Sequence, residues 1–522
     1  MEDVDTKPLN LAMAERTATP DATSPRTGGA VGAVGAVGAV GAVGAVGVIG
    51  GGWAGMAAAL ELAQAGRVVH VFEAAPVLGG RARRVARRHP QVAGELDNGQ
   101  HLLLGAYRHT LALMRRAGVD PDAALLRLPL QMAYADGWQL QAPRLPAPWH
   151  LLGMGLTARG LGWRERAALA RALSRLRADS DADDAEDAVD GTDAGTAGET
   201  VAAWLAQAPS SLRERLWFPL CVAALNTPAE QADARVFRRV LRDSLLAARG
   251  DSDMLVPRRD LSRLFPEAAA QAIVAAGGTV RTGAAVQQIS QAQHGWLLQT
   301  GAGQQEVAQL VIATAPRQAA RLLAQITHRS HQPALQAAAA KLQAFDHVPI
   351  VTLYLNVGAL RLPRPFLALD ASAAAPGQFV FDRAALSTEP DASAAPDRDN
   401  VWSVVISAAD DAAAMPQAEL ARRVRAQLAA QLAPCIGDAA RLADAPGEFV
   451  IAERLATFRC VPGLARPGND IGVPRLALAG DYTDGRDGAY GPYPATIEAA
   501  TRSGSAAAAL LQRERVPSAE TA

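Results

Sequence analysis

Short hydrophobic runs and segments with helical spacing alternate along most of the chain. The runs are rich in β-branched residues and predict strands, at VGVIG (46–50), VVHVF (68–72), GTVRTGAAVQQI (278–289), GWLLQT (295–300), QLVIATA (309–315), PIVTLYLNV (349–357), QFVFD (378–382), VWSVVIS (401–407) and RLALAG (475–480). Helical spacing predicts helices over residues 53–66, 160–177, 200–248, 261–276, 415–433 and 493–511. Strands and helices alternate at both ends of the chain, whereas the middle is mixed. This pattern predicts an α/β fold, with a Rossmann-like nucleotide-binding domain built from discontinuous segments and an inserted α+β substrate-binding domain.

A glycine motif, Gly50-x-Gly52-x-x-Gly55, joins the first strand to the first helix. Gly50 allows a tight turn, Gly52 lets the backbone approach a pyrophosphate, and Gly55 permits close packing of helix on strand. The backbone that opens the helix faces the phosphates, at Trp53 and Ala54. The second strand leads to Glu73, whose carboxylate can accept hydrogen bonds from a ribose 2′-hydroxyl and would repel a 2′-phosphate. Together these features predict a dinucleotide site.

The residues after Glu73 indicate which dinucleotide the site binds, FAD or NAD. Gly79-Gly80-Arg81 follows the acidic residue directly. This sequence resembles the GGR element of FAD enzymes in the amine oxidase and phytoene desaturase superfamily, in which the arginine reaches the cofactor and the glycines allow a close backbone passage. Because further arginines follow up to residue 88, a solvated basic stretch is the alternative for Arg81.

The C-terminal part of the chain supplies a second match to the same superfamily. RLALAGDYTD (475–484) ends a strand at Gly480-Asp481, and Pro494 opens the predicted helix 493–511. The resemblance implies that Asp481 binds the ribityl chain and that the helix N-terminus points at the pyrimidine edge of the flavin, with Ala495 and Thr496 at the cofactor. FAD is therefore the expected cofactor.

Further stretches resemble a narrower group, the squalene-associated FAD-dependent desaturase family. They are ELDNGQHLLLGAY (95–107), RLWFPLCVAALNTP (215–228), VLRDSLL (240–246), DMLVPRRDLSRLFP (253–266), PIVTLYLN (349–356) and GQFVFDR (377–383). The resemblance covers most of residues 45–510, but Tyr482 stands where family members usually have Trp, and the connection before Pro494 is longer. It implies an FAD-dependent oxidoreductase that reduces 12-hydroxysqualene, an apolar triterpene alcohol, to squalene in hopanoid biosynthesis, with an electron donor that reduces the flavin.

The implied reaction needs a proton, because hydroxide is a poor leaving group and departs as water from an allylic cation that then accepts hydride. His101 and Asp97 are the candidate donors, since their segment runs past the flavin in the resembled superfamily. Histidine has a suitable unperturbed pKa, although a structural role is the alternative for each residue. The resemblance also places Gly99 and Gln100 at the cofactor, and the backbone near Val286 at the adenine.

Three other functions compete with this one. A carotenoid or phytoene desaturase would oxidise a similar polyene, and the cofactor motifs do not separate it from a reductase. A prenyl-binding protein of the GDP-dissociation-inhibitor type uses the same fold without catalysis, but would not need Glu73, Arg81 and Asp481 together. Amine oxidases commonly place a lysine near flavin N5, whereas this chain has only Lys7 and Lys341.

Composition and charge limit the classes of ligand and partner that we expect. With 51 Lys and Arg against 52 Asp and Glu, the net charge is −1, which gives no electrostatic case for binding nucleic acid. The three cysteines are far apart without a CxxC pair, so no metal site is indicated. The polar, acidic start lacks the pattern of a secretory signal, so we expect a cytoplasmic protein, with peripheral contact to the inner membrane of a bacterium as an open alternative.

The segment APWHLLGMGLTARGLGW (147–163) predicts either a monotopic membrane contact or a helix packed on the substrate domain. Aliphatic residues in 215–228 and 345–356 predict either the lining of an apolar tunnel or ordinary core. The expected domain order is a disordered extension (1–29), an AVG repeat (30–47), FAD-binding parts 45–104, 261–320 and 453–513, substrate-domain parts 105–260 and 321–452, an acidic disordered loop (179–199) and a tail (514–522).

Overall fold

A computed structural model describes residues 44–85, 92, 95–178, 198–328, 330–386, 400–445, 447–485 and 491–514. The chain divides into two units, 1–40 and 41–522, and the structure below is that of the second. The predicted extension, most of the AVG repeat, residues 179–197 of the acidic loop and the tail from 515 lie outside the described residues.

A five-stranded parallel sheet is assembled from distant parts of the chain. Its order is β18 (Leu476–Leu478), β12 (Gln309–Ile312), β1 (Val46–Ile49), β2 (Val69–Phe72) and β8 (Thr279–Arg281). Each neighbouring pair is parallel. Apart from the edge strand β8, the strands are short, mostly apolar runs because both faces of the sheet are covered. At Gly47 of β1, for example, Leu298 and Val307 lie 3.0 and 3.1 Å from where a Cβ would be. This sheet of discontinuous segments confirms the predicted α/β fold class.

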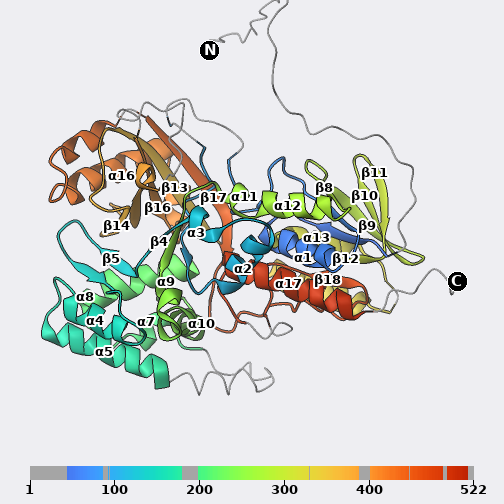
Figure 1. The fold of residues 1–522 in the computed structure, drawn as a ribbon, viewed down its shortest axis with the longest axis horizontal. Coiled ribbons are helices and arrows are strands. Elements are labelled where there is room, and N and C mark those ends of the chain that lie inside the picture. Colours follow the sequence, from blue (N-terminus) through green and yellow to red (C-terminus); the bar gives the residue numbers. More distant parts are fainter. Residues whose placement is uncertain are drawn as a thin grey trace, which may run out of the picture. The chain divides into compact units, whose positions relative to one another are not determined.

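Helices α1 (Trp53–Gln64) and α17 (Ile497–Arg513) pack side by side on this sheet (Figure 1). A Cβ on Gly504 of α17 would lie 2.2 Å from the carbonyl oxygen of Ala54, so this close approach requires glycine. The expectation that Pro494 opens the last helix was wrong. The helix begins at Ile497, because the Thr496 side chain accepts a hydrogen bond from the Ala499 N–H and caps it.

The strand predicted over residues 278–289 is two strands in different sheets. Gly283, with φ of +66°, turns the chain between β8 and β9 (Val286–Ala292). β9 pairs with β10 (Gly295–Thr300), which pairs with β11 (Gly303–Val307). The alternation of hydrophobic residues runs through the turn, so the sequence pattern does not mark the break at Gly283.

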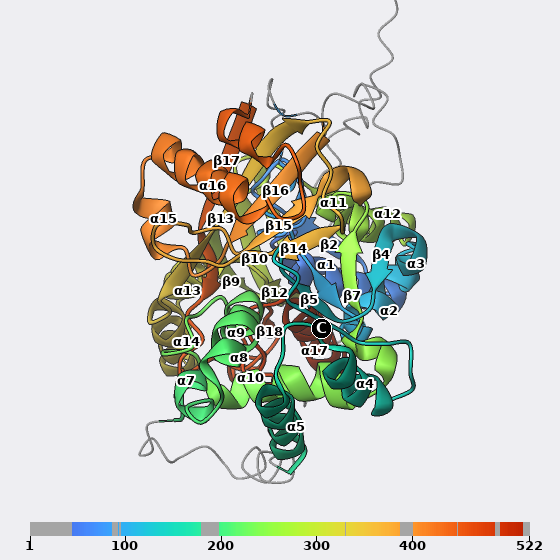
Figure 2. The ribbon, with the colours of Figure 1, turned by 90° about the vertical axis from the view of Figure 1, so that its left-hand side faces the viewer.

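The inserted domain contains a five-stranded antiparallel sheet (Figure 2). Its order is β14 (Phe366–Ala368), β15 (Phe379–Asp382), β16 (Asn400–Ile406), β13 (His347–Gly358) and β17 (Gly447–Phe458). Val351, Leu353 and Leu355 on one face of β13 form a core with α16 (Gln417–Gln431). β17 was missed because most of its residues are half-buried and three are charged, so no alternation marks it.

The helical block predicted over 200–248 is broken into short pieces. These are α7 (Val201–Trp204), α8 (Ser210–Leu212), η1 (Arg213–Trp217), α9 (Phe218–Leu225), α10 (Ala234–Leu241) and η2 (Arg242–Leu246). Asn226 has φ of +49° and ends α9, and the Asp233 carboxylate caps α10. Polar residues that end and start helices therefore interrupt a continuous helical pattern.

The remaining elements connect these layers. They are β3 (Leu103–Leu104), α2 (Arg108–Arg116), α3 (Pro121–Ala124), β4 (Leu125–Leu128), β5 (Gln131–Ala133), β6 (Gln139–Gln141), α4 (Trp149–Thr157), α5 (Trp163–Ala178), η3 (Arg249–Ser252), β7 (Met254–Pro257), α11 (Leu261–Leu264), α12 (Pro266–Ala275), α13 (Pro316–Gln325), α14 (Gln332–Gln343), η4 (Arg383–Ala385), α15 (Asp410–Ala414) and η5 (Ala439–Asp444). Across the described part of the chain, every helix is too short or too polar to cross a bilayer.

Candidate functional site

The glycine motif forms a tight turn between β1 and α1. Gly50 has φ of +113°, and its N–H donates to the carbonyl of Phe72 at 2.8 Å. A Cβ on Gly55 would lie 1.9 Å from the carbonyl oxygen of Gly50, so the helix approaches the strand as closely as its backbone allows. Gly52 caps α1 and has only Gly80 near its missing Cβ, at 3.6 Å. The turn thus presents open backbone at the helix N-terminus.

Glu73 follows β2 directly and points its carboxylate at the same turn. Its oxygens accept hydrogen bonds from the N–H groups of Gly51 at 2.5 Å and Ala75 at 2.7 Å. The carbonyl of Glu73 accepts from the Ala284 N–H, which brings the segment before Val286 alongside. The acid and the strand that the resemblance places at the adenosine part of FAD are therefore neighbours.

The Gly79-Gly80-Arg81 loop meets the C-terminal motif. Arg81 donates from Nη2 to Oδ1 of Asp481 at 2.6 Å and from Nη1 to the carbonyl of Ala456 at 2.6 Å. A Cβ on Gly80 would lie 3.1 Å from the Cα of Gly52, so the loop also touches the first glycine turn. Arg81 is thus directed inward, to a carboxylate that is 7% exposed, rather than into a solvated basic stretch.

Four further residues predicted at the cofactor have side chains that serve the fold. The indole of Trp53 donates to the carbonyl of Ala82 and packs against Phe265 with ring centroids 5.3 Å apart, so its side chain is core. Ala54 is buried in α1 against Gly504. Thr496, with Ala495 before it, uses its hydroxyl to cap α17. At these positions the main chain at a helix N-terminus is what remains for a ligand.

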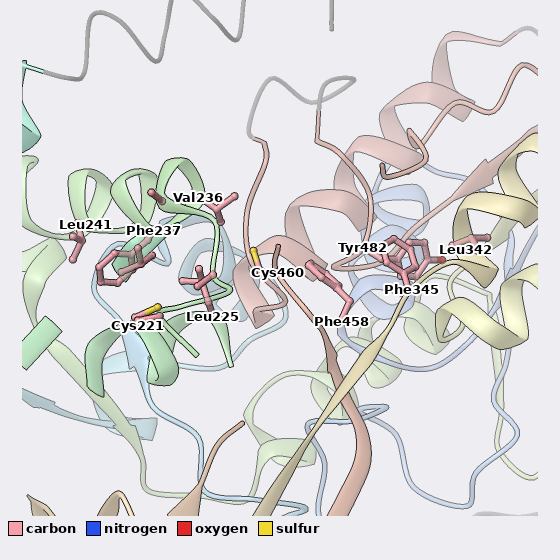
Figure 3. Close-up of a cluster of buried hydrophobic side chains, with 14 of the residues drawn as sticks. Cys221, Leu225, Val236, Phe237, Leu241, Leu342, Phe345, Phe458, Cys460 and Tyr482 are labelled. Carbon is pink, nitrogen blue, oxygen red and sulfur yellow. The ribbon is translucent and has the colours of Figure 1, made fainter. Parts of the chain in front are cut away.

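Gly480 accommodates the aromatic ring that follows it. A Cβ on Gly480 would lie 2.2 Å from the ring of Tyr482, whose hydroxyl donates to the carbonyl of Ala479. Figure 3 shows Tyr482 beside Phe345 and Phe458 in a buried cluster that continues to Cys221 and Phe237 of the helical region. The residue that departs from the resembled motif therefore joins the flavin motif to the core of the inserted domain.

The segment with the candidate proton donors lies on the inner face of the antiparallel sheet, opposite α16. A Cβ on Gly99 would lie 3.5 Å from the Thr352 hydroxyl and 3.9 Å from the His101 ring. Gln100 donates to the carbonyl of His101 and accepts from the Ser403 hydroxyl. The segment is tied to the glycine loop because the Asn98 amide donates to the carbonyl of Arg81 at 3.3 Å.

His101 and Asp97 are placed differently. His101 Nδ1 lies 3.0 Å from the carbonyl of Gly99, which accepts the Nδ1–H and leaves Nε2 for another partner. Burial lowers the pKa of His101. The Asp97 carboxylate accepts from the Leu261 N–H at 2.9 Å, at the start of α11, and burial raises its pKa to about 7. Asp97 therefore holds neighbouring backbone, whereas Nε2 is the ring nitrogen of His101 that the Gly99 carbonyl leaves for another partner.

Two threonines and an arginine were missed by the sequence analysis. Thr314 Oγ1 and Thr352 Oγ1 are inaccessible to solvent and have no hydrogen-bond partner among the described residues. Thr314 lies at the Gly50 turn, where its N–H is 3.3 Å from the missing Cβ. Arg466 is 7% exposed, stacks on Phe458 and donates to the carbonyl of Tyr493 just before α17. None of them belongs to a motif, so no signal in the sequence marks them.

These observations fit the FAD that the sequence predicts. No side chain lies within 4 Å of the missing Cβ of Gly52 or Gly80, whose backbones face each other, and the orphaned hydroxyl of Thr314 lacks a partner that a phosphate or ribose would provide. Glu73, Arg81 and Asp481 come from distant segments and border the same turn. The fold and the site together define a flavin-dependent oxidoreductase.

The comparison with known families agrees. Residues 53–512 match the family described as flavin containing amine oxidoreductase. The chain belongs to this family, and its membership confirms FAD as the cofactor.

Curated relatives and solved structures extend the match over nearly the whole chain. A hydroxysqualene dehydroxylase of Rhodopseudomonas palustris is 31% identical over 475 residues, covering 88% of this chain and 96% of the relative. One from Sinorhizobium fredii is 27% identical, covering 89% and 97%. Among solved structures, cyclohexylamine oxidase from Brevibacterium oxydans has a TM-score of 0.61 at 19% identity, covering 89% of this chain and 98% of its own. Putrescine oxidase has a TM-score of 0.60 at 16% identity, covering 90% and 99%.

Proposed function

We propose that this chain reduces 12-hydroxysqualene to squalene as a hydroxysqualene dehydroxylase. The observation that carries the proposal is the 31% identity to such an enzyme over 96% of its length. A match of that extent includes the inserted domain as well as the dinucleotide motifs. Since the motifs are shared by many oxidoreductases, the inserted domain is the part that bears on the substrate.

FAD would be held by the residues that border the glycine turn. The backbone of Gly50, Gly52 and Gly80 suits its pyrophosphate, and the Glu73 carboxylate suits a ribose. Arg81 occupies Oδ1 of Asp481 and leaves Oδ2 to accept from a ribityl hydroxyl. When bound and reduced, FAD supplies a hydride.

The chain itself has to deliver a proton and exclude water. Protonation of the allylic hydroxyl breaks the C–O bond and releases water, and hydride addition to the resulting allylic cation gives the hydrocarbon. His101 is our candidate donor, through Nε2, since Nδ1 is engaged by the carbonyl of Gly99. Leu102 beside it packs among apolar residues of the sheet face, including Val405 and Phe381, which keep water from the segment.

Among the described residues, no lysine lies on the sheet face that carries His101, which weighs against an amine oxidase. Lys341 lies in α14, is exposed, and donates to the carbonyl of Arg466 at 3.4 Å. The other lysine, Lys7, lies outside the described residues. A polyene desaturase remains the alternative within the family, because it would use the same cofactor motifs on a similar hydrocarbon.

The test is one anaerobic reaction of the dithionite-reduced protein with 12-hydroxysqualene, followed by flavin absorbance and by extraction of the lipid. We expect squalene to form in step with flavin reoxidation, one for one. A flavin that stays reduced, with no squalene formed, would overturn the proposal. Conversion of a polyene by the oxidised protein would then establish the desaturase.

A further inference from the structure

One short stretch of the chain carries most of the exposed large hydrophobic side chains. Among the described residues eight such side chains are exposed, and five of them lie between residues 145 and 163. They are Leu145 (43% exposed), Trp149 (60%), Leu152 (49%), Leu156 (78%) and Trp163 (75%), and we call them the α4 patch. Single exposed apolar residues are ordinary on a protein surface, whereas a contiguous group of this kind marks an interaction site.

The patch is one side of a firmly anchored helix. Trp149, Leu152 and Leu156 follow helical spacing on α4, so their side chains share a face. On the opposite side His150, Leu151 and Met154 are buried, and Leu151 and Met154 belong to the core of the helical region. One face of the helix therefore packs on the domain, as the second alternative predicts, and the other face is exposed among the described residues.

The C-terminal end of α4 has its backbone carbonyls satisfied from within the protein. Arg166 of α5 donates to the carbonyls of Leu156 at 2.7 Å and Ala158 at 2.7 Å, and also to that of Gly155. The Thr157 hydroxyl donates to the carbonyl of Gly153 at 2.9 Å. Carbonyls without partners would be costly to bury in an apolar medium, so these bonds remove a barrier to burying this helix end.

The segment that carries the patch, with α5 after it, is rich in arginine. Residues 144–177 contain seven arginines and one acidic residue, Glu165. The Glu165 carboxylate is engaged by the Gly162 N–H and by the Ser211 hydroxyl. Arg144, Arg159 and Arg164 are exposed, and Arg164 lies 5.4 Å from the ring centroid of Trp163. Tryptophan and arginine beside aliphatic residues are the composition of a segment that lies in a membrane interface.

We propose that the α4 patch docks this protein on the surface of an anionic lipid bilayer. The apolar side chains enter the boundary between headgroups and acyl chains, and the arginines contact the phosphate groups. A second copy of this chain suits the patch less well, because a two-fold contact would bring the arginines of both copies together. α4 and α5 lie together in the lower part of Figures 1 and 2, so one surface can carry both the patch and the arginines.

This proposal goes beyond the proposed reaction, and its test needs no turnover. Flavin-loaded full-length protein is floated with vesicles of phosphatidylcholine alone or with about 30 mol% phosphatidylglycerol. We expect binding to the anionic vesicles, weakened by about 0.5 M salt, and a blue shift of tryptophan fluorescence. The variant W149S/L156S/W163S should bind at least about tenfold more weakly, since it removes three side chains that would be buried in lipid.

The matched control removes three exposed hydrophobic side chains elsewhere, as V68S/V274S/L455S. It should bind vesicles like the wild type, and both variants should keep full flavin occupancy, which shows that they fold. A second variant, R144Q/R159Q/R164Q, should lose the preference for phosphatidylglycerol. Wild-type protein that does not float, or an α4-patch variant that floats equally well, would overturn the proposal. A dimer that the α4-patch variant turns into a monomer, without vesicle binding, would assign the patch to a second copy instead.

Discussion

Arg81 and Asp481 are 400 positions apart in the chain and form an ion pair, with Nη2 and Oδ1 2.6 Å from each other. Arg81 follows β2, and Asp481 follows β18, on the opposite side of β1 in the parallel sheet. Because parallel strands present their carboxyl ends at one edge of the sheet, both loops reach the same turn. The ion pair thus joins the two loops that border the candidate flavin site.

Replacing Asp481 by Asn should weaken FAD binding at least about tenfold, since it leaves the half-buried guanidinium of Arg81 without its charge partner. The free energy of unfolding should also fall by roughly 1–3 kcal/mol, the cost of leaving a partly buried donor without its acceptor. Dissociated flavin is measured by its fluorescence, and stability by denaturant unfolding. The control is Asp411→Asn on exposed α15, which should change neither. A D481N protein with wild-type affinity would mean that the pair serves the fold alone.

Glu73→Ala should lower FAD occupancy with the fold retained. The carboxylate accepts from the N–H groups of Gly51 and Ala75 and lies where a ribose is expected. Glu73→Gln keeps one acceptor oxygen and should retain part of the occupancy. The flavin-to-protein absorbance ratio after purification gives the answer, with circular dichroism as the check on folding. Normal flavin content in the alanine variant would remove Glu73 from the cofactor site.

If His101 donates the proton, the rate of squalene formation by the reduced enzyme should rise as the pH falls. Burial lowers the pKa of His101 from its ordinary value of 6.5, so the imidazolium that acts as an acid is abundant only below that value. His101→Gln should reduce the rate by about 10²–10⁴ and abolish this pH dependence. Single-turnover rates between pH 5 and 8 test it, and an unchanged pH profile in the variant would exclude His101.

Replacing Asp97 by Asn should change how the stability of the folded protein depends on pH. Burial raises its pKa from 3.8 to about 7, so the folded state binds its proton more tightly than the unfolded state. The contribution of Asp97 to stability is greatest below pH 3.8 and is lost as the pH rises to about 7. The Tm of D97N relative to wild type should therefore increase between pH 4 and 7 and level off above. A constant difference would show that the carboxyl titrates normally.

Replacing residues 179–197 by a short Gly-Ser linker should leave flavin content and activity unchanged. Gly198 and Glu199 are kept, because a Cβ on Gly198 would lie 2.8 Å from Pro462 and the carbonyl of Glu199 accepts from the Ala234 N–H. Activity per bound flavin is the measurement. A large loss would give the acidic segment a role in the reaction.

The sequence by itself determined the fold class and the composition of the flavin motifs. Glycines at 50, 52 and 55 have to be glycine because backbone atoms lie where a Cβ would be or a ligand would pass, and such local constraints show in a single sequence. The apolar runs of β1, β2, β12 and β18 were equally visible, because strands buried on both faces are rarely interrupted by polar residues. The order of elements then implied that the domain is discontinuous.

Only the tertiary structure decided which residues meet. The long strand β17 carries charges and half-buried residues without a period, and its pairing with β13 comes from hydrogen bonds between distant backbones. The burial of Arg466, the orphaned hydroxyls of Thr314 and Thr352, and the different surroundings of His101 and Asp97 arise from packing between separate segments. The exposure and the pKa of a side chain depend on which other segments of the chain pack over it. The order of residues along one segment does not contain that information.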